Sequence, residues 1–205
     1  AVQTIFFADG GVNALGANTL NMSLIAAGAG GFLFNLMTKK GANKKISLGI
    51  ASLASVLLAA VACSFEVAIS GTVNLAKVLP SMLSVHTLIG LGEGLLTVAV
   101  YSILVSCESF WKENENAVTF GAMTLSFFGA LFSPLASGFP DGLEWVAGKL
   151  FFKEFSAYEF SALFPDYQAL FSTNEALATI SAGVIGIGLT VLFTYPIGKL
   201  IHISK

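Results

Sequence analysis

Arginine is absent from this chain of 205 residues, and charged residues of any kind are scarce. Only 11% of the residues are charged and 55% are hydrophobic, whereas ordinary globular domains carry about 25% charged residues. This shortage excludes a soluble globular protein. The ten basic residues are all lysines and the formal net charge is −2, so no basic patch is available to neutralise phosphates. The composition therefore also excludes a nucleic-acid partner.

Motifs of catalysis and of nucleotide binding are missing as well. The sequence contains neither the GxxxxGK[ST] pattern of a P-loop nor the HExxH pattern of a zinc protease. Its two histidines, His86 and His202, are too few for a complete nitrogen-rich metal site. Cys63 and Cys107 are expected near opposite ends of their spans, so a disulfide bond between them is not expected. The expected spans contain no pair of aspartates, and no serine stands out as a candidate nucleophile for a hydrolase. An enzyme is therefore not expected.

Long apolar runs are what the chain has in abundance. A helix that crosses the roughly 30 Å hydrocarbon core needs about 20 residues. The runs predict an all-α fold: a polytopic transmembrane helix bundle of four full spans plus a stub, with an extracytoplasmic amphipathic segment. The stub is residues 1–7, expected to end a span that begins before Ala1, and the amphipathic segment is residues 137–175. The four numbered spans are expected ahead of the amphipathic segment, at 20–37, 46–69, 82–107 and 118–136, and a last span is expected after it at 176–200.

The lysines predict an orientation for these spans. The stretch TKKGANKK holds Lys39, Lys40, Lys44 and Lys45, and the positive-inside rule places it in the cytoplasm. Alternation then puts seven of the ten lysines, and the C-terminus, on the cytoplasmic side of the inner (plasma) membrane. The first loop and the amphipathic segment are expected on the outer side.

The stretch FADGGVNALGANTLNM, residues 7–22, joins three glycines to one acid and three amides. Asp9, Asn18 and Asn21 offer hydrogen-bonding groups, and the glycines permit unusual backbone conformations. A membrane tolerates such a loop only where protein or a water-filled cavity surrounds it. The stretch therefore predicts a re-entrant or bundle-capping loop, with Asn18 and Asn21 at the start of the helix that follows.

Two acids and one histidine fall within the expected spans, where such side chains are costly and often functional. Glu66 lies near the outer end of its span, and both a function and harmless exposure remain open for it. His86 and Glu93 are seven residues apart, which sets them on one helical face. One interpretation is that His86 supports a ligand site while Glu93 pairs with a donor on a neighbouring helix. The alternative is that both side chains only form hydrogen bonds that stabilise the helix bundle.

The expected span 82–107 also contains three closely spaced glycines. Gly90 and Gly94 form a GxxxG pattern, and Gly92 adds a third position without a side chain. Such small residues let another helix approach closely. Gly90 and Gly94 are therefore predicted to be helix-packing positions.

The amphipathic segment begins with Pro140, Asp141 and Gly142. These residues predict a turn into a short helix, with Asp141 or Ser137 as its cap. The acids and aromatic rings that follow are typical of a structure at the membrane interface. A solvated acidic face is favoured over a metal-gathering role for the acids.

Two groups of motifs resemble a known transporter family. FADGGVNALGANTLNM followed by HTLIGLGEGLLTVAV resembles the substrate-capture membrane subunit of energy-coupling-factor transporters for cobalt and nickel, the CbiM/NikM type. PDGLEWVAGKLF, with PDY at residues 165–167 and a final span, resembles the PDGLE module of an accessory subunit. The expected division is a metal-capture part at 1–112 and a PDGLE module at 113–205.

The resemblance implies import of Co²⁺ or Ni²⁺ as the transported ligand, without a cofactor. It implies a coupling transmembrane subunit and separate ATPase subunits as partners. The family's primary metal ligands, a terminal amine and early histidines, have no counterpart here, so the N-terminal part is expected to be missing. An alternative is a structural or assembly subunit that binds no solute. Residues expected to line or buttress the pocket are Asp9, Asn18, Asn21, His86 and Glu93.

Overall fold

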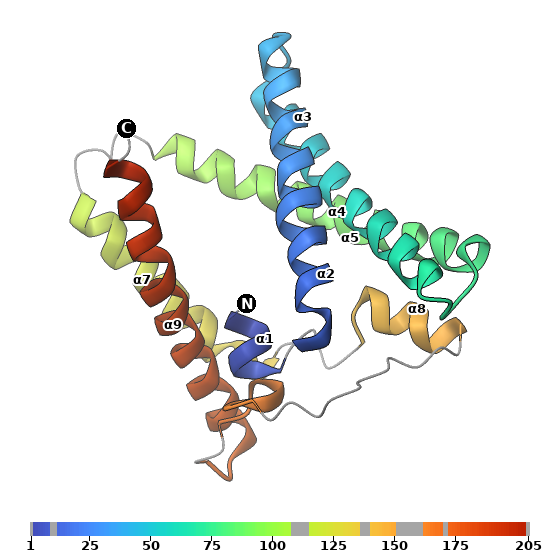
Figure 1. Ribbon diagram of the computed structural model, residues 1–205. Helices are drawn as coiled ribbons and strands as arrows, with labels where there is room; N and C mark the ends of the chain where they lie inside the picture. The colour runs from blue at the N-terminus through green and yellow to red at the C-terminus, as the bar shows by residue number, and fades with distance from the viewer. Residues whose placement is uncertain are drawn as a thin grey trace. The chain divides into compact units, whose positions relative to one another are not determined.

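The computed structural model of the protein is built from helices (Figure 1). It describes residues 2–8, 12–107, 115–135, 140–150, 162–169 and 172–203. The regular elements in these ranges are all helical, so the predicted all-α fold is confirmed. Within the described ranges, four helices are long and apolar enough to cross a membrane: Val12–Lys39, Lys44–Ile69, Leu75–Ser106 and Glu175–Pro196. A shorter apolar helix covers Gly121–Leu131.

Short 3₁₀ and π segments extend or connect the α-helices. The 3₁₀ segments are η1, η3 and η4, and η2 is a π-helix. In chain order the elements are α1 (Val2–Phe7), η1 (Val12–Ala14), α2 (Leu15–Thr19), η2 (Leu20–Ala27), α3 (Gly28–Lys39), α4 (Lys44–Ile69), α5 (Leu75–Ser106), α7 (Glu115–Leu131), η3 (Ser133–Leu135), α8 (Gly142–Leu150), η4 (Pro165–Tyr167) and α9 (Glu175–Ile203).

The first membrane-length helix begins earlier than the sequence predicts. From Val12 onward the chain runs through η1, α2 and η2 into α3 as one helical rod. The predicted loop is therefore wrong beyond Val12, and Asn18 and Asn21 lie within the helix instead of at its start. The physical reason is that a helix pairs its own backbone N–H and C=O groups in hydrogen bonds. A loop in an apolar setting leaves many of these groups unpaired. Asp9 lies outside the described residues.

The span predicted at 118–136 is the one that falls short of membrane length. The helix α7 ends at Leu131, and the 3₁₀ turn η3 follows with Pro134 inside it. Proline has no backbone N–H and clashes with the preceding turn, so it stops the helix. The last span, predicted at 176–200, is full-length in α9.

Tight turns connect α3 to α4 and α4 to α5. Each turn contains a glycine at positive φ, +82° for Gly41 and +75° for Gly71, a conformation that other residues rarely adopt. Each also ends in an asparagine cap. Asn43 and Asn74 accept hydrogen bonds from backbone N–H groups in the first turn of the following helix, at 2.9 Å in both cases. These local signals place α3, α4 and α5 in a continuous hairpin series.

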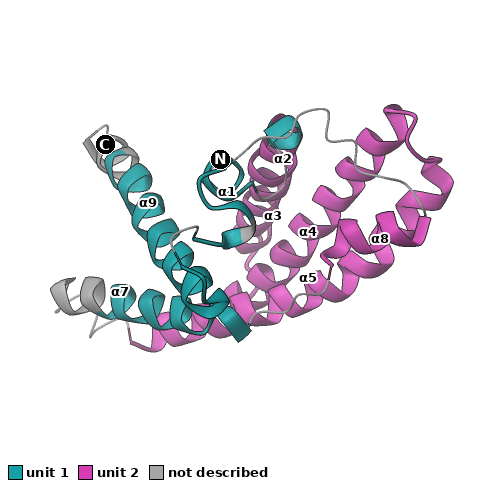
Figure 2. Ribbon diagram, turned by 90° about the horizontal axis from the view of Figure 1, so that it is seen from below, with its two compact units in different colours: residues 1–15, 111–138, 156–205 teal, residues 16–110, 139–155 magenta. Residues whose placement is uncertain are grey.

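The helices form two compact units, coloured separately in Figure 2. One unit consists of residues 16–110 and 139–155. Within it, α4 and α5 lie side by side, η2 and α3 pack on α4, and α8 packs on α5 (Figure 1). The other unit consists of residues 1–15, 111–138 and 156–205. Within it, α1, η3, η4 and α7 pack on α9.

Glycines set the close approach of α4 and α5. A Cβ atom added to Gly94 would lie 3.1 Å from the backbone oxygen of Gly49, and one added to Gly90 would lie 2.8 Å from Leu53 Cδ1. Gly90 and Gly94 are both buried. In contrast, Gly92 meets nothing within 4 Å, so it does not contribute to this contact.

The core of the second unit forms around Phe7. This ring is 2% exposed, packs on Ala178 and Ala182 of α9, and stacks on Tyr167 with a centroid distance of 4.8 Å. A Cβ atom on Gly186 would lie 3.0 Å from the ring. The short helix α1 is thereby held on α9.

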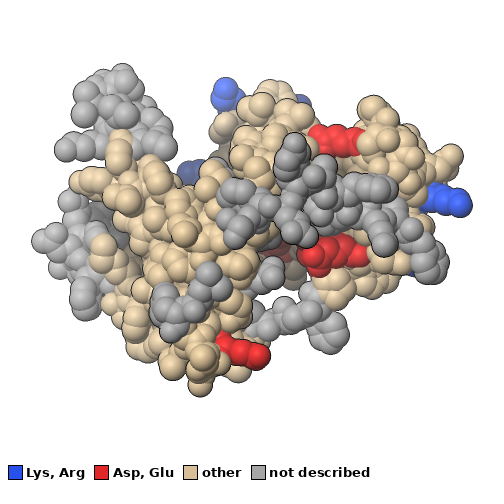
Figure 3. Space-filling view, turned by 60° about the horizontal axis from the view of Figure 1, so that its bottom comes forward, with Lys and Arg blue, Asp and Glu red and all other residues tan. Residues whose placement is uncertain are grey.

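Apolar side chains dominate the outer surface of the long helices. Leu88 and Leu95 on α5 are each 74% exposed, and Phe32 on α3 is 69% exposed. On the face drawn in Figure 3, few charged side chains stand among uncharged ones. Such a surface suits contact with lipid and not with water.

Candidate functional site

A polar pair lies between two apolar helices. Asn21, on the π-helix η2, is 5% exposed, and its Nδ2 donates a hydrogen bond to Glu66 Oε2 on α4 at 2.8 Å. The two residues are 45 positions apart in the chain. A carboxylate makes this bond stronger than one between neutral groups. The π-helix is also unusual, since such segments are rare and often occur at functional sites.

One acceptor of the Asn21–Glu66 pair stays unused. Asn21 Oδ1 is buried and accepts no hydrogen bond from the described residues. An orphaned buried acceptor costs about 1–3 kcal/mol, and here it stands beside a carboxylate. Among the described residues no positive charge is paired with these two oxygen-bearing groups, and their negative potential favours a cation or another hydrogen-bond donor. The pair is therefore the strongest candidate for a cation contact within the described spans.

His86 has one ring nitrogen fixed by the backbone. Its Nδ1 lies 2.8 Å from the carbonyl oxygen of Met82, one turn earlier on α5. A carbonyl oxygen only accepts, so the hydrogen-bond network assigns the proton to Nδ1. In the neutral ring the lone pair is then on Nε2, the form in which histidine binds metals.

The turn that precedes α8 closes with a reciprocal cap. Asp141 Oδ1 accepts from the Glu144 backbone N–H at 2.8 Å, and Glu144 Oε2 accepts from the Asp141 N–H at 3.1 Å. This is a capping box, which fixes the start of a helix. The predicted turn and the cap at Asp141 are confirmed, whereas Ser137 lies outside the described residues.

The structure distributes the predicted site residues unevenly. Asn18 is half-buried on α2, and Glu93 is exposed on α5. His86 and Glu93, expected on one face, are not hydrogen-bonded to each other in the described part of the chain. Glu66 is the residue that sequence reasoning left open. An acid in one apolar span and an amide in another could have indicated the pair, but no pattern identified them as partners.

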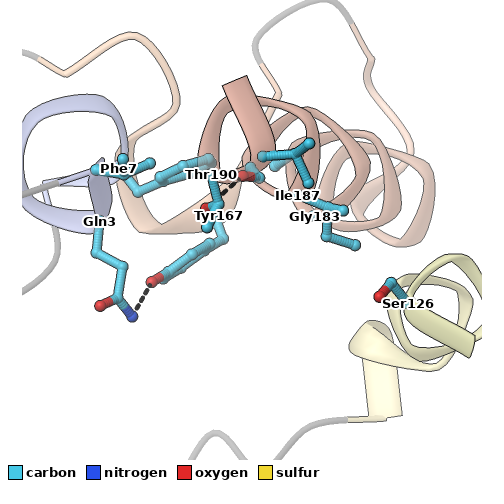
Figure 4. Close-up of a pocket in the computed structure, with 11 residues that line it drawn as sticks. Gln3, Phe7, Ser126, Tyr167, Gly183, Ile187 and Thr190 are labelled. Atoms are coloured by element: carbon cyan, nitrogen blue, oxygen red, sulfur yellow. Dashed lines mark hydrogen bonds between the residues drawn. The ribbon is translucent and has the colours of Figure 1, made fainter. Parts of the chain in front are cut away.

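A separate cavity lies in the unit built on α9. Its volume is about 630 Å³, and Figure 4 shows Gln3 donating to the Tyr167 hydroxyl at its edge, at 3.2 Å. The lining includes no acid, lysine or histidine. This cavity is therefore a poor place for a metal ion. The lining residues are Val2, Gln3, Phe7, Ser126, Tyr167, Ala182, Gly183, Gly186, Ile187, Thr190 and Val191.

Metal-ligating side chains do not gather into a full site in the described ranges. No group of three or more histidines, cysteines, aspartates or glutamates is close enough there to hold an ion. Cys63 and Cys107 are not joined by a disulfide bond in the part of the chain that the structure describes.

Comparisons with known proteins match the chain along most of its length. Residues 1–111 match the family model CbiM, described as the cobalt uptake substrate-specific transmembrane region. Residues 115–203 match the PDGLE domain. No solved structure matches the chain.

The relatives are transport proteins. The chain is 31% identical over 195 residues to a putative fused nickel transport protein NikMN of Archaeoglobus fulgidus, covering 90% of this chain and 64% of the relative. It is 28% identical over 110 residues to the cobalt transport protein CbiM of Acetoanaerobium sticklandii, covering 50% of this chain and 45% of the relative. A CbiM of Limosilactobacillus reuteri is 28% identical over 119 residues, covering 55% and 48%. The chain thus spans about half to two thirds of each relative's length. With polar groups set between membrane-length helices and a family model matching more than half of its residues, the chain belongs to the CbiM family of cobalt uptake transmembrane regions and carries a C-terminal PDGLE domain.

Proposed function

We propose that this protein is the substrate-capture membrane component of an energy-coupling-factor transporter that imports Co²⁺ or Ni²⁺. The observation that carries the proposal is the succession of a cobalt uptake region and a PDGLE domain in one chain, alignable over 195 residues with a fused nickel transport protein. The multi-pass helical architecture supports it.

The chemistry of the polar groups agrees with a cationic substrate. The Asn21–Glu66 pair presents oxygen atoms, and His86 presents a nitrogen lone pair. Imidazole and carboxylate groups suit first-row divalent ions, and second ligand shells of this kind orient the primary ligands. Asp9, Asn18 and Glu93 stay candidates from the sequence alone. The terminal amine and histidines that the family resemblance implies as primary ligands stay a prediction.

The proposed energy source lies on other chains. ATPase subunits would hydrolyse ATP and act on this chain through a coupling transmembrane subunit, in agreement with the lack of a P-loop pattern in this sequence. The lysine-rich turn between α3 and α4 favours a cytoplasmic location for that turn and for the C-terminus, in the inner (plasma) membrane. In this orientation α8 lies on the outer side.

A second candidate is an assembly subunit that binds no metal itself. It is favoured by the lack of any cluster of three metal-ligating side chains in the described ranges. In that case the chain would stabilise the complex while its partners handle the ion.

Uptake in a host without its own cobalt or nickel import distinguishes the candidates. Cells that express the protein with its coupling and ATPase subunits are expected to accumulate labelled Co²⁺ or Ni²⁺, and cells without the ATPase subunits are not. A complex that accumulates the ion equally well when this protein is omitted would contradict the proposal. Retained uptake after loss of both Glu66 and His86 would favour the assembly role.

Replacing His86 by alanine is expected to weaken metal loading by about 10-fold to 100-fold, the usual cost of losing an orienting partner of a metal ligand. Isothermal calorimetry of the purified complex measures the effect. His202→Ala is the matched control, because the other histidine lies near the end of α9. Equal affinity of the two variants would argue against a role for His86.

A further inference from the structure

We infer that the PDGLE turn at residues 140–144 positions the imidazole of His86, so that the PDGLE domain acts on the metal-capture region through a contact within the chain. The importance of this contact for transport rests on the proposed function, whereas the contact itself does not. Both partners belong to the same compact unit.

The approach of Gly142 to the ring is the first observation. A Cβ atom on Gly142 would lie 2.9 Å from His86 Cε1 and 3.1 Å from His86 Nε2. The first distance is shorter than real Cβ contacts, and the second is tighter than most of them. Only glycine lets the first turn of α8 come this close to the edge of the ring that carries Nε2.

The ring has little freedom to move aside. Its Nδ1 is tied to the Met82 carbonyl oxygen at 2.8 Å, so a swing away from α8 would break that bond. Ile89 Cδ1 also lies 3.1 Å from the added Cβ position, so a side chain at position 142 would press on Ile89 as well. A side chain at position 142 would therefore displace either the imidazole or α8.

The rest of the motif secures the turn against α5. Asp141 and Glu144 form the capping box that fixes the start of α8. Leu143 packs at the edge of a core cluster in which Val146 is fully buried with Met82. The residue whose carbonyl holds the imidazole is thus also a residue on which α8 docks.

Four of the five residues of the motif then have a structural role. The two acids shape the helix start, the leucine anchors it, and the glycine leaves room for the ring. Docking of α8 fixes the direction of Nε2, the nitrogen that can bind a borderline divalent ion. Gly142 is a positioning residue in this arrangement, since its effect reaches the ion through His86.

The test compares two glycines of α8. Gly142→Ala places a methyl group against the ring, whereas Gly148→Ala is the matched control because nothing lies within 4 Å of its added Cβ. With ¹⁵N-labelled histidine, the His86 resonances are expected to shift in Gly142→Ala and to stay in place in Gly148→Ala, with His86→Gln assigning the signals. Metal loading is expected to fall about 10-fold in Gly142→Ala alone.

Two further variants protect the interpretation. Asp141→Ala removes the cap without adding bulk, and it is expected to broaden the same His86 signals as α8 loosens. Gly142→Ala is expected to raise the protease sensitivity of α8, and this increase is expected to be smaller in a His86→Ala background, where only the flexible end of Ile89 still lies against the added methyl group. Unchanged His86 signals in both single variants would overturn the inference, whatever uptake shows. Shifted signals with unchanged uptake would uphold the contact and overturn its role in transport.

Discussion

Replacing Gly94 by leucine is expected to separate α4 from α5 and to lower the thermal stability of the protein more than any other glycine substitution on α5. The added Cβ would lie 3.1 Å from the backbone oxygen of Gly49, and a backbone atom cannot turn aside as a side chain can. Overpacking of this kind costs about 1–3 kcal/mol, and leucine adds atoms beyond Cβ. Thermal unfolding of the detergent-solubilised protein, followed by circular dichroism, measures the loss.

Two neighbouring glycines calibrate that result. Gly92→Leu is expected to leave the unfolding temperature close to that of the unmodified protein, because Gly92 meets nothing within 4 Å. Gly90→Leu is expected to fall between the two, since its nearest neighbour is the mobile end of the Leu53 side chain. Equal losses at all three positions would show that helix propensity, and not the α4–α5 contact, sets the stability.

Replacing Asn21 by leucine is expected to destabilise the protein by about 2–3 kcal/mol and to abolish most metal uptake. Leucine has a similar size but leaves Glu66 Oε2 without the hydrogen bond that Asn21 Nδ2 donates at 2.8 Å. A carboxylate between apolar helices is costly without a donor. Thermal unfolding and labelled-ion uptake are measured on the same preparations.

Three variants separate the charge from the hydrogen bond. Asn35→Leu, on an exposed position of the same helical rod, is the matched control and is expected to behave as the unmodified protein. Glu66→Gln can still accept from Asn21, so its stability is expected to hold while uptake falls about 10-fold. The double variant Asn21→Leu with Glu66→Leu is expected to be more stable than Asn21→Leu alone, because no carboxylate is left unpaired. Normal uptake by Glu66→Gln would contradict a role for its charge.

The two matched regions of the chain do not pack as separate bodies. The helix α8 belongs to the PDGLE match but packs on α5, whereas α1 belongs to the cobalt uptake match but packs on α9. Each compact unit therefore contains elements of both regions. The division into a metal-capture part at 1–112 and a PDGLE module at 113–205 stays a prediction.

The membrane-spanning character of the protein could be predicted from local properties alone. Apolar composition, run length and turn residues can be read within short stretches of sequence. The predicted spans 46–69 and 176–200 therefore agree with α4 and α9 to within three residues at each end. Local signals failed at residues 12–19, where glycines and amides indicate a loop in isolation. The surrounding helix tolerates them because its own backbone bonds are satisfied.

The candidate site depended on contacts between distant residues. Asn21 and His86 stood out as polar groups in apolar runs, but their partners could not be read from spacing. Glu66 is 45 positions from Asn21, and Gly142 meets His86 from another helix. Periodicity reports which face of a helix a residue occupies, and not which helix covers that face. Only the packing of the helices decided which carboxylate accepts the hydrogen bond from the Asn21 amide and which glycine lies against the imidazole of His86. Close contact between helices depends on the shapes of both surfaces at once.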